Sequence, residues 1–320
     1  MLDPIGLGLD GQDDPSWTGK SPSARRILVT LLSLFVYPDP RPCPSLAFIE
    51  ALGLLGYDAG TARMALSRAR GAKWLESQRE GRRTFWTLSE TGRTLLTAGR
   101  QRLVTLEKPP YDWDKRLLVL HASVPEDRRS VRYVLQNRLS WLGFGRLSPG
   151  TWISFRLEAE PEVAALLNDL DLPDGILFVA TLGLAGDMTR MAHRAWDLEG
   201  LANRYKSFVK EYAETTVHGG DDALVVYSRM VTDWRAFPFL DPTLPREIAP
   251  ADWPGRDAIR LYRDLSRTLR KPALARWDDF IRAASRSDLS TKRKVDSNVL
   301  SRWAPLVLAV KALNRARQCW

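Results

Sequence analysis

AGTARMALSRARGAKWLESQREGRRTFWTL, residues 59–88, is the stretch that decides the fold of the N-terminal part of this chain. Its first half places apolar residues at the spacing of a helix. Its second half contains two short strand-like runs that meet at Glu80-Gly81, a pair typical of a tight turn. We therefore expect a helix followed by a two-stranded hairpin, which is the order of elements in a winged helix-turn-helix domain.

The expected helix has two different faces. Ala62, Ala65, Leu66 and Ala69 fall on one stripe, as in a helix that docks on a core. The opposite side and its flanks are predicted to contact duplex DNA. Arg63 is expected to read a base, because a guanidinium pairs bidentately with guanine O6 and N7. The other predicted contacts from this segment are Thr61, Met64, Ser67, Arg68, Arg70 and Lys73. A solvated, arginine-rich amphipathic helix is the alternative interpretation.

The hairpin supplies a cationic wing. Arg79, Arg82 and Arg83 gather near its turn and are expected to contact phosphates rather than bases. Because a helix fits the major groove and basic side chains of the hairpin can follow the neighbouring phosphates, this arrangement favours duplex DNA as the partner.

Two helices are expected before the reading helix. Ser21-Pro22 has the pattern of an N-cap followed by proline at the first helical position, and a second helix fits residues 45–55. Ser23 and Arg25, near the start of the first helix, are predicted phosphate contacts. The apolar run of that helix is about eleven residues, shorter than the ~20 needed to span a membrane, so we expect no membrane partner.

The positive charge of the chain is concentrated. The net charge is +9 over 320 residues, and residues 61–102 carry ten Lys/Arg against three Glu. A second basic stretch, residues 285–320, carries eight Lys/Arg against two Asp. The two cysteines, Cys43 and Cys319, lie far apart in sequence, which favours a reducing, cytoplasmic location without a disulfide framework. Residues 1–20 have no basic region of a signal or transit peptide and are expected to form a disordered arm.

The pattern changes after Pro109-Pro110, and we expect an α+β protein of three domains. The winged helix-turn-helix domain with its linker helix covers 21–108. A ferredoxin-like α/β domain covers 111–184, with strands over 116–124, 144–147, 151–155 and 176–182 and helices over 125–142 and 161–170. A helical C-terminal domain covers 189–320, with helices over 191–215, 221–237, 254–269, 272–284 and 298–318.

Enzyme motifs are missing from the sequence. His121, His193 and His218 lack the spacing of metal ligands. A nuclease built on the ferredoxin-like domain would need a carboxylate at the end of its first strand. Instead, Glu126 and Asp127 lie at the start of a helix, where capping explains them. We therefore expect no catalytic residue, no metal and no resident cofactor.

Several blocks of the chain resemble the PaaX-type repressors, with a GntR-like winged helix. They are SARRILVTLL (23–32), TARMALSRARGAKWL (61–75), EGRRTFWTLSETG (80–92), WLGFGRLSPGTWIS (141–154), WDLEGLANRYKSF (196–208), DWRAFPFLDPTLP (233–245) and PADWPG (250–255). The resemblance implies a winged helix, a ferredoxin-like domain similar to a CRISPR adaptation nuclease, and a helical C-terminal domain. It also implies a dimeric transcriptional repressor that leaves DNA when it binds an aryl- or acyl-CoA thioester.

The resemblance places the reading helix on 61–70 and the wing on 79–83. For an effector, an apolar slot and arginines would be needed, and Trp196, Trp234 and Arg235 are the predicted contacts. We therefore interpret the chain as a homodimeric repressor of a catabolic operon that reads an inverted-repeat operator in double-stranded DNA. The alternatives are a winged-helix interaction or RNA-binding subunit without operator specificity, and a metal-dependent nuclease of the ferredoxin-like type.

Overall fold

The computed structural model describes residues 22–37, 41–106, 113–181, 183, 186–250 and 252–286, which form two compact units. Of the described residues, those within 22–100, 215–234 and 262–286 form unit 1, and those within 101–214 and 235–261 form unit 2. The expected arm at 1–20, the proline pair at 109–110 and the expected helix at 298–318 lie outside the described residues. The three-domain limits 21–108, 111–184 and 189–320 stay predictions.

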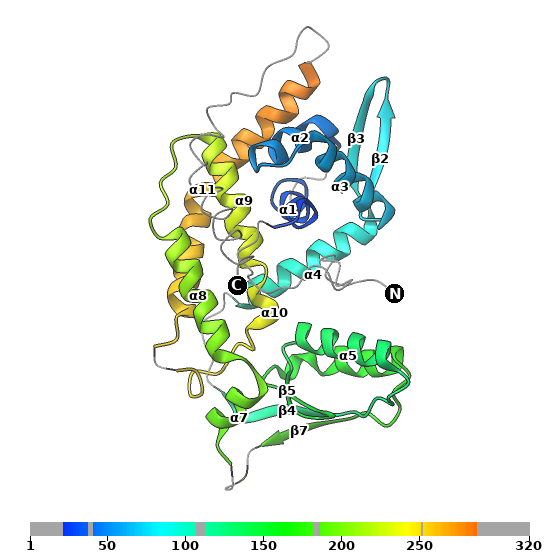
Figure 1. The fold of residues 1–320 in the computed structure, drawn as a ribbon, viewed down its shortest axis with the longest axis vertical. Helices are drawn as coiled ribbons and strands as arrows, with labels where there is room; N and C mark the ends of the chain where they lie inside the picture. The colour runs from blue at the N-terminus through cyan, green and yellow to red at the C-terminus, as the bar shows by residue number, and fades with distance from the viewer. Residues whose placement is uncertain are drawn as a thin grey trace, which may run out of the picture. The chain divides into compact units, whose positions relative to one another are not determined.

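Unit 1 contains the expected helices and hairpin (Figure 1). Its N-terminal elements are α1 (Ala24–Leu31), which continues as the π-helical segment η1 (Leu32–Val36), β1 (Cys43–Pro44), α2 (Ser45–Leu54), α3 (Ala59–Gly71), β2 (Leu75–Glu80), β3 (Arg83–Leu88) and α4 (Glu90–Leu106). The three strands are ordered β1-β3-β2. The short strand β1 was not expected. The N-cap of α1 was expected at Ser21 but is Ser23, whose Oγ accepts a hydrogen bond from the Arg26 amide at 3.3 Å.

Helices from the C-terminal third complete the core of unit 1. Helix α9 (Gly220–Trp234) contacts α1 and α2, and the Thr232 Oγ1 donates a buried hydrogen bond of 2.8 Å to the Thr30 Oγ1. Helix α11 (Gly255–Arg286) brings the fully buried Trp277 against the rings of Phe35 and Phe48, each with a centroid distance of 5.2 Å. The winged helix therefore shares one core with two later segments of the chain.

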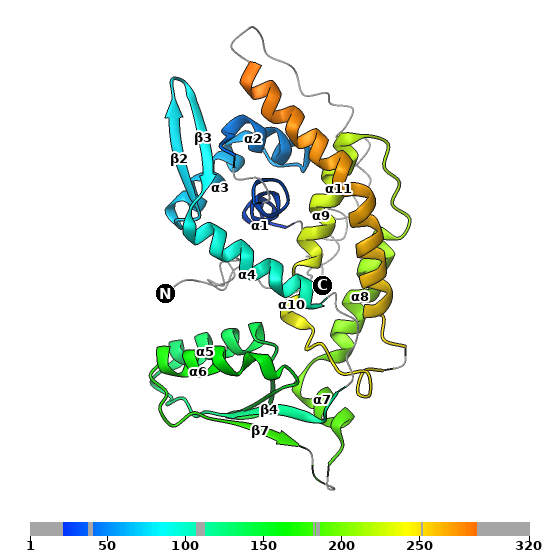
Figure 2. The same cartoon turned by 180° about the vertical axis from the view of Figure 1, so that it is seen from behind.

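Unit 2 is built on a ferredoxin-like sheet. The chain runs through β4 (Arg116–His121), α5 (Arg129–Trp141), β5 (Gly145–Ser148), β6 (Thr151–Ser154), the 3-10 segment η2 (Leu157–Ala159), α6 (Glu160–Asp169) and β7 (Ile176–Thr181). The strands are ordered β5-β6-β4-β7 and every neighbouring pair is antiparallel. This order confirms the expected mixed fold class, and α5 and α6 lie together over one face of the sheet (Figure 2).

The C-terminal third also adds to unit 2. Helix α7 (Met188–Ala195) packs with residues 244–253 on the second face of the sheet, where Leu117, Ile153 and Phe155 are buried. Helix α8 (Leu198–Tyr212) meets α10 (Phe237–Leu240) through parallel rings of Tyr205 and Phe237 whose centroids are 4.2 Å apart.

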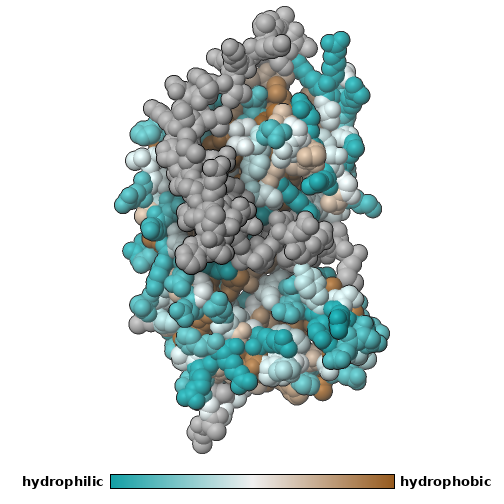
Figure 3. All heavy atoms as spheres, viewed as in Figure 1, coloured by the Kyte–Doolittle hydropathy of each residue, from teal (hydrophilic) through white to brown (hydrophobic). Residues whose placement is uncertain are grey.

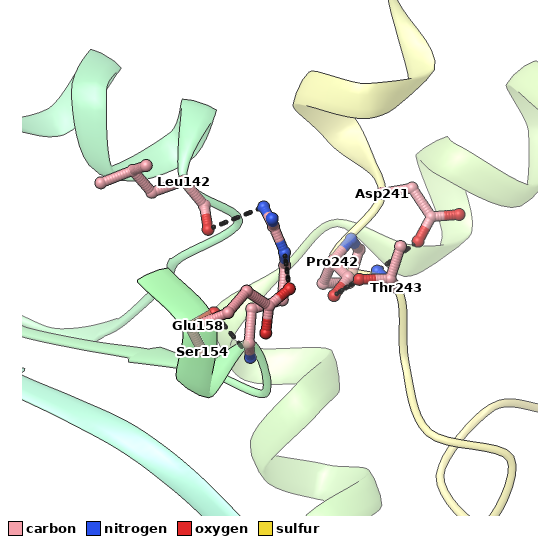
Figure 4. Close-up of polar contacts among 7 residues, drawn as sticks. Leu142, Ser154, Glu158, Asp241, Pro242 and Thr243 are labelled. Carbon is pink, nitrogen blue, oxygen red and sulfur yellow. Dashed lines mark hydrogen bonds and ion pairs between the residues drawn. The ribbon is translucent and has the colours of Figure 1, made fainter. Parts of the chain in front are cut away.

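One arginine fixes the end of α5 to the sheet. The Arg156 Nη1 donates to the Leu142 carbonyl at 3.3 Å and its Nε donates to the Glu158 carboxylate at 3.1 Å. The Arg156 amide donates to the Ser154 Oγ at 3.2 Å, and Figure 4 shows the three partners Leu142, Ser154 and Glu158. The turn that leads from α5 into β5 is thereby held in place.

Two expectations about the C-terminal helices were wrong. The helix expected over 191–215 is divided into α7 and α8 because Asp197 caps the second helix by accepting the Gly200 amide at 2.9 Å. The helices expected over 254–269 and 272–284 are one helix, α11, with Pro272 inside it. Buried Leu269, Ala273 and Trp277 continue one helical stripe across the proline, so packing compensates for the lost hydrogen bond. No helix among the described residues is both long and apolar enough to cross a membrane.

Candidate nucleic-acid interface

The helix α3 begins with a cap that occupies one predicted DNA contact. The Asp58 Oδ1 accepts the Thr61 amide at 2.9 Å, and its Oδ2 accepts the Thr61 hydroxyl at 2.7 Å. These hydrogen bonds lower the pKa of the Asp58 carboxyl, with the bond from the Thr61 side chain as the largest cause. The Thr61 hydroxyl is thus used to start the helix, and a base contact through it would compete with the cap.

The two faces of α3 differ sharply in burial. Its four core residues are Ala62, Ala65, Leu66 and Ala69, each at most 5% exposed. The structure brings the other predicted side chains of the helix onto its exposed side, namely Arg63, Met64, Ser67, Arg68 and Arg70. Met64, the apolar member of this set, is 54% exposed. Their contact with DNA stays a prediction.

The wing is a regular hairpin beside α3. The strands β2 and β3 pair from Leu75↔Leu88 to Glu80↔Arg83, leaving Gly81 and Arg82 as the two-residue turn. Gly81 has a φ of +59°, a conformation that favours glycine in such turns. The hairpin extends past α2 and α3 in Figure 1, and hydrophilic side chains lie over it in Figure 3.

The arginines of the wing differ in their surroundings. Arg79 and Arg82 are exposed, whereas Arg83 is half-buried. The Arg79 Nε donates to the Gly81 carbonyl at 3.2 Å, so this side chain lies along the turn. The Arg70 Nη1 donates to the Ser77 Oγ at 3.3 Å, which links α3 to β2 and holds the two cationic elements together.

The two predicted phosphate contacts at the start of α1 have structural roles. The Ser23 Oγ is the N-cap acceptor described above. The Arg25 guanidinium lies over the Trp74 ring, 4.8 Å from its centroid, and so packs against the residue that precedes β2. Because one face of the Arg25 guanidinium is stacked on the Trp74 ring, a phosphate contact would have to use the N–H groups at the edge of the guanidinium.

Lys73 combines exposure with backbone strain. It follows the end of α3 with a φ of 60°, where glycine is the usual residue. The Lys73 amide donates to the Arg70 carbonyl and the Trp74 amide to the Ala69 carbonyl, each at 2.9 Å, which closes the helix end around this conformation. A left-handed conformation costs a non-glycine residue about 1–2 kcal/mol. A cation kept at a strained position suggests that its charge has a function.

We expect the substitution Lys73→Gly to raise the free energy of unfolding by about 0.5–1 kcal/mol. Relief of the strained backbone outweighs the ~0.4–1 kcal/mol by which a flexible glycine favours the unfolded chain. The same variant should bind duplex DNA less tightly, and its affinity should depend less on salt. Urea denaturation and a salt titration of DNA binding measure the two effects. A variant that is less stable, or one that binds DNA as well as the parent protein, would contradict this explanation.

The three predicted effector residues are not gathered at one site. Trp196 lines a cavity of about 250 Å³ in unit 2. Trp234 belongs to unit 1, is completely buried and stacks on Tyr262 with a centroid distance of 4.4 Å. Arg235 belongs to unit 2 and is half-buried, but it is not among the residues that line this cavity. Among the described residues, no three His, Cys, Asp or Glu side chains come together as metal ligands.

Sequence reasoning missed other residues around this cavity, including Arg146, Trp152 and Asp241. A signal for two of them was present in WLGFGRLSPGTWIS, where an arginine interrupts an apolar strand and a tryptophan follows on the next one. The signal for Asp241 was weaker, because an aspartate before proline is common in turns.

Comparison with known proteins gives one family along the described chain. Family models described as PaaX-like protein, PaaX protein central Cas2-like domain and PaaX-like protein C-terminal domain match residues 23–92, 110–192 and 196–279. Transcriptional repressor PaaX of Escherichia coli (strain K12) is 28% identical over 235 residues, which cover 69% of this chain and 72% of that protein.

A solved structure is also similar. Uncharacterized protein Rv0674 from Mycobacterium tuberculosis has a TM-score of 0.53 and 25% sequence identity, and the match covers 81% of this chain and 98% of that one. Since three successive domain models of one family match in order, the chain belongs to the PaaX-like protein family.

Proposed function

We propose that this protein is a DNA-binding transcriptional repressor, acting in the cytoplasm, whose unit 1 reads duplex DNA. The observation that carries the proposal is the exposed side of α3, with Arg63, Met64 and Ser67, placed next to a hairpin with exposed Arg79 and Arg82. The similarity to a protein named as a transcriptional repressor supports it.

The chemistry of this surface suits direct reading of bases. The major groove admits an α-helix, and there a guanidinium such as that of Arg63 pairs with guanine. The exposed apolar side chain of Met64, adjacent in sequence, is suited to contact the methyl group of thymine. Arg79 and Arg82 would contact phosphates, which positions the helix without selecting a sequence.

A homodimer on an inverted repeat is part of the proposal. Two-fold symmetry would place two copies of α3 in major grooves about 34–36 Å apart along the duplex. An interaction surface is available on β7, the edge strand of the sheet in unit 2, where Ile176, Phe178 and Val179 are 51%, 51% and 49% exposed. Apolar edge strands favour pairing with another chain.

The proposed regulation follows from the family resemblance. An aryl- or acyl-CoA thioester would release the repressor from the promoter of a catabolic operon. Such an effector acts only if it binds the DNA-free conformation more tightly than the DNA-bound one.

Selection of bound fragments from genomic DNA tests this function directly. We expect recovery of a short inverted repeat that the full chain then binds as two copies per duplex, measured by mobility shift and analytical ultracentrifugation. Parallel titrations with random duplex, structured RNA and duplex plus Mg²⁺ test the two alternative functions, RNA binding and metal-dependent cleavage. Tighter binding to RNA, or metal-dependent cleavage of the duplex, would replace the repressor by an RNA-binding subunit or a nuclease.

Arg82→Ala should weaken binding to all duplexes alike. The exposed guanidinium at the turn is expected to neutralise one phosphate, so the slope of log affinity against log salt should fall by about 1. Fluorescence anisotropy with operator and with random duplex, each at several salt concentrations, measures the affinity and its salt slope. Arg260→Ala is the matched control, because Arg260 is exposed and pairs with Asp257 on α11. A larger loss on operator than on random DNA would show that Arg82 reads sequence.

A further inference from the structure

The cationic tip of the wing lies far from the base of the hairpin. The tip carries Arg79, Arg82 and Arg83, whereas the base is the pair Leu75↔Leu88. Strands rise ~3.4 Å per residue, so the tip lies about 17 Å from the base. A rotation of about 10° at the base would move the tip by about 3 Å, which is the length of a hydrogen bond. The tip can meet phosphates at a fixed place only if the hairpin is held further out.

A side chain of α2 holds the hairpin near its tip. The strand β1 pairs with residues 85 and 86 of β3, and α2 begins at the next residue, Ser45. The position on β3 that continues this register is Thr84. Here the Ser45 side chain takes the place of the main chain, because its Oγ donates to the Thr84 carbonyl at 3.1 Å. In Figures 1 and 2, β3 is the strand of the hairpin on the side of α2.

A second partner fixes the direction of this hydrogen bond. The Trp86 Nε1 donates to the Ser45 Oγ at 2.7 Å. An indole N–H can only donate, so the Ser45 oxygen accepts from it and the hydroxyl proton is left for the Thr84 carbonyl. Trp86 is only 7% exposed, and burial strengthens both bonds because little water competes for them. We call this pair of hydrogen bonds the Ser45 clamp.

The Ser45 clamp connects the reading helix with the cationic tip. On the side of the helices, α2 packs on α3. On the side of the hairpin, Thr84 pairs with Arg79 and directly follows Arg83. The bond from Arg70 of α3 to Ser77 of β2 holds the hairpin nearer to its base. The position of the tip relative to α3 therefore depends on the clamp.

We propose that Ser45 is a positioning residue for DNA binding. Through the Thr84 carbonyl it holds the tip of the wing at the distance from α3 at which both reach the same duplex. The inference rests on the proposed function and adds to it a residue outside the predicted contacts. Loss of the Ser45 hydroxyl lets the tip move, so that phosphate contacts are lost while base reading by Arg63 is kept.

Salt titrations of duplex binding with the full chain test this role. In Ser45→Ala, affinity for the operator should fall about three- to tenfold, as for one lost hydrogen bond. The slope of log affinity against log salt should fall by about 1, as in Arg82→Ala. Because both substitutions remove the same phosphate contact, the double variant should bind within about twofold of the weaker single variant. Ser45→Thr keeps the hydroxyl and should bind as the parent does, and the guanine preference assigned to Arg63 should persist in Ser45→Ala.

A buried hydroxyl elsewhere in unit 1 provides the control. Thr232→Val removes the bond of 2.8 Å from α9 to the Thr30 Oγ1 of α1, so it should lower stability but leave the salt slope unchanged. Hydrogen exchange without DNA is a second, independent measurement. In Ser45→Ala, deuterium uptake should rise in residues 78–85 and stay unchanged in α1. If Ser45→Ala does not fold, Ser45→Cys, whose thiol is a weak donor, replaces it in both measurements.

Failure of this inference differs from failure of the proposed function. A parent protein that binds no duplex would show that the proposed function is wrong, and the role of Ser45 with it. If the parent binds duplex, the inference alone is overturned by an unchanged salt slope in Ser45→Ala, or by losses that multiply in the double variant with Arg82→Ala. Weak binding by Ser45→Thr, or unchanged exchange in residues 78–85 of Ser45→Ala, would overturn it as well.

Discussion

Replacement of Trp277 by alanine is expected to lower the free energy of unfolding of unit 1 by about 3–5 kcal/mol, as for other large aromatic residues in cores. The Trp277 ring is fully buried, stacks on Phe35 with an interplanar angle of 14° and meets the edge of Phe48 at 72°. Its Nε1 has no hydrogen-bond partner within the described chain, so the expected loss comes from packing and from the cavity left behind.

Urea denaturation followed by circular dichroism measures this effect. Trp277→Phe keeps a ring in the same place and should lose less than half as much stability. Val104→Ala, at a residue that is 51% exposed on α4, is the control and should change stability by less than ~0.5 kcal/mol. DNA affinity should fall together with stability in Trp277→Ala, since the ring packs against η1 and α2. A loss below 1 kcal/mol would show that α11 is not required by the winged helix.

Arg63→Ala is expected to relax the sequence preference at one base position by about 1–3 kcal/mol, or roughly 5- to 150-fold. Arg63 is exposed near the N-terminal end of α3, opposite the buried Ala62, Ala65 and Leu66. A helix end reaches the floor of the major groove before the rest of the helix, which makes this guanidinium the best placed to meet a base.

The measurement compares operator duplexes that carry each base at every position. In Arg63→Ala, duplexes with guanine at one position should no longer bind more tightly than duplexes with another base there. The base preferences at the other positions should be unchanged. Arg82→Ala is the comparison variant, because it should lower all affinities by a common factor. If Arg63→Ala lowers binding to operator and random duplex equally, Arg63 contacts phosphate and another residue of α3 reads the sequence.

The reading helix and the wing could be predicted because local rules determine them. The spacing of the small and apolar residues among the arginines predicts a helix whose buried face consists of Ala62, Ala65, Leu66 and Ala69. A glycine in a two-residue turn sets the register of the hairpin. The sheet of unit 2 followed from its strand and helix order, since few topologies accommodate that order. Contact with DNA by the named residues remains a prediction.

The C-terminal third was harder to predict because its structure depends on distant partners. Pro272 indicated a helix end, yet the buried stripe through Leu269, Ala273 and Trp277 keeps α11 continuous. Trp234 was expected to contact an effector, but no local pattern tells a ligand-binding tryptophan from one that is stacked inside a core on Tyr262.

The discontinuous composition of unit 1 has a consequence for protein synthesis. Residues 22–100 are synthesised before residues 215–286, but the rings of Phe35 and Phe48 meet their partner only when Trp277 has been translated. Until then these apolar surfaces remain open on the nascent chain, where chaperones can bind them. The core of the winged helix is therefore completed only after the C-terminal third has been translated. A fusion of this winged helix to another regulator would have to include residues 215–234 and 262–286 as well.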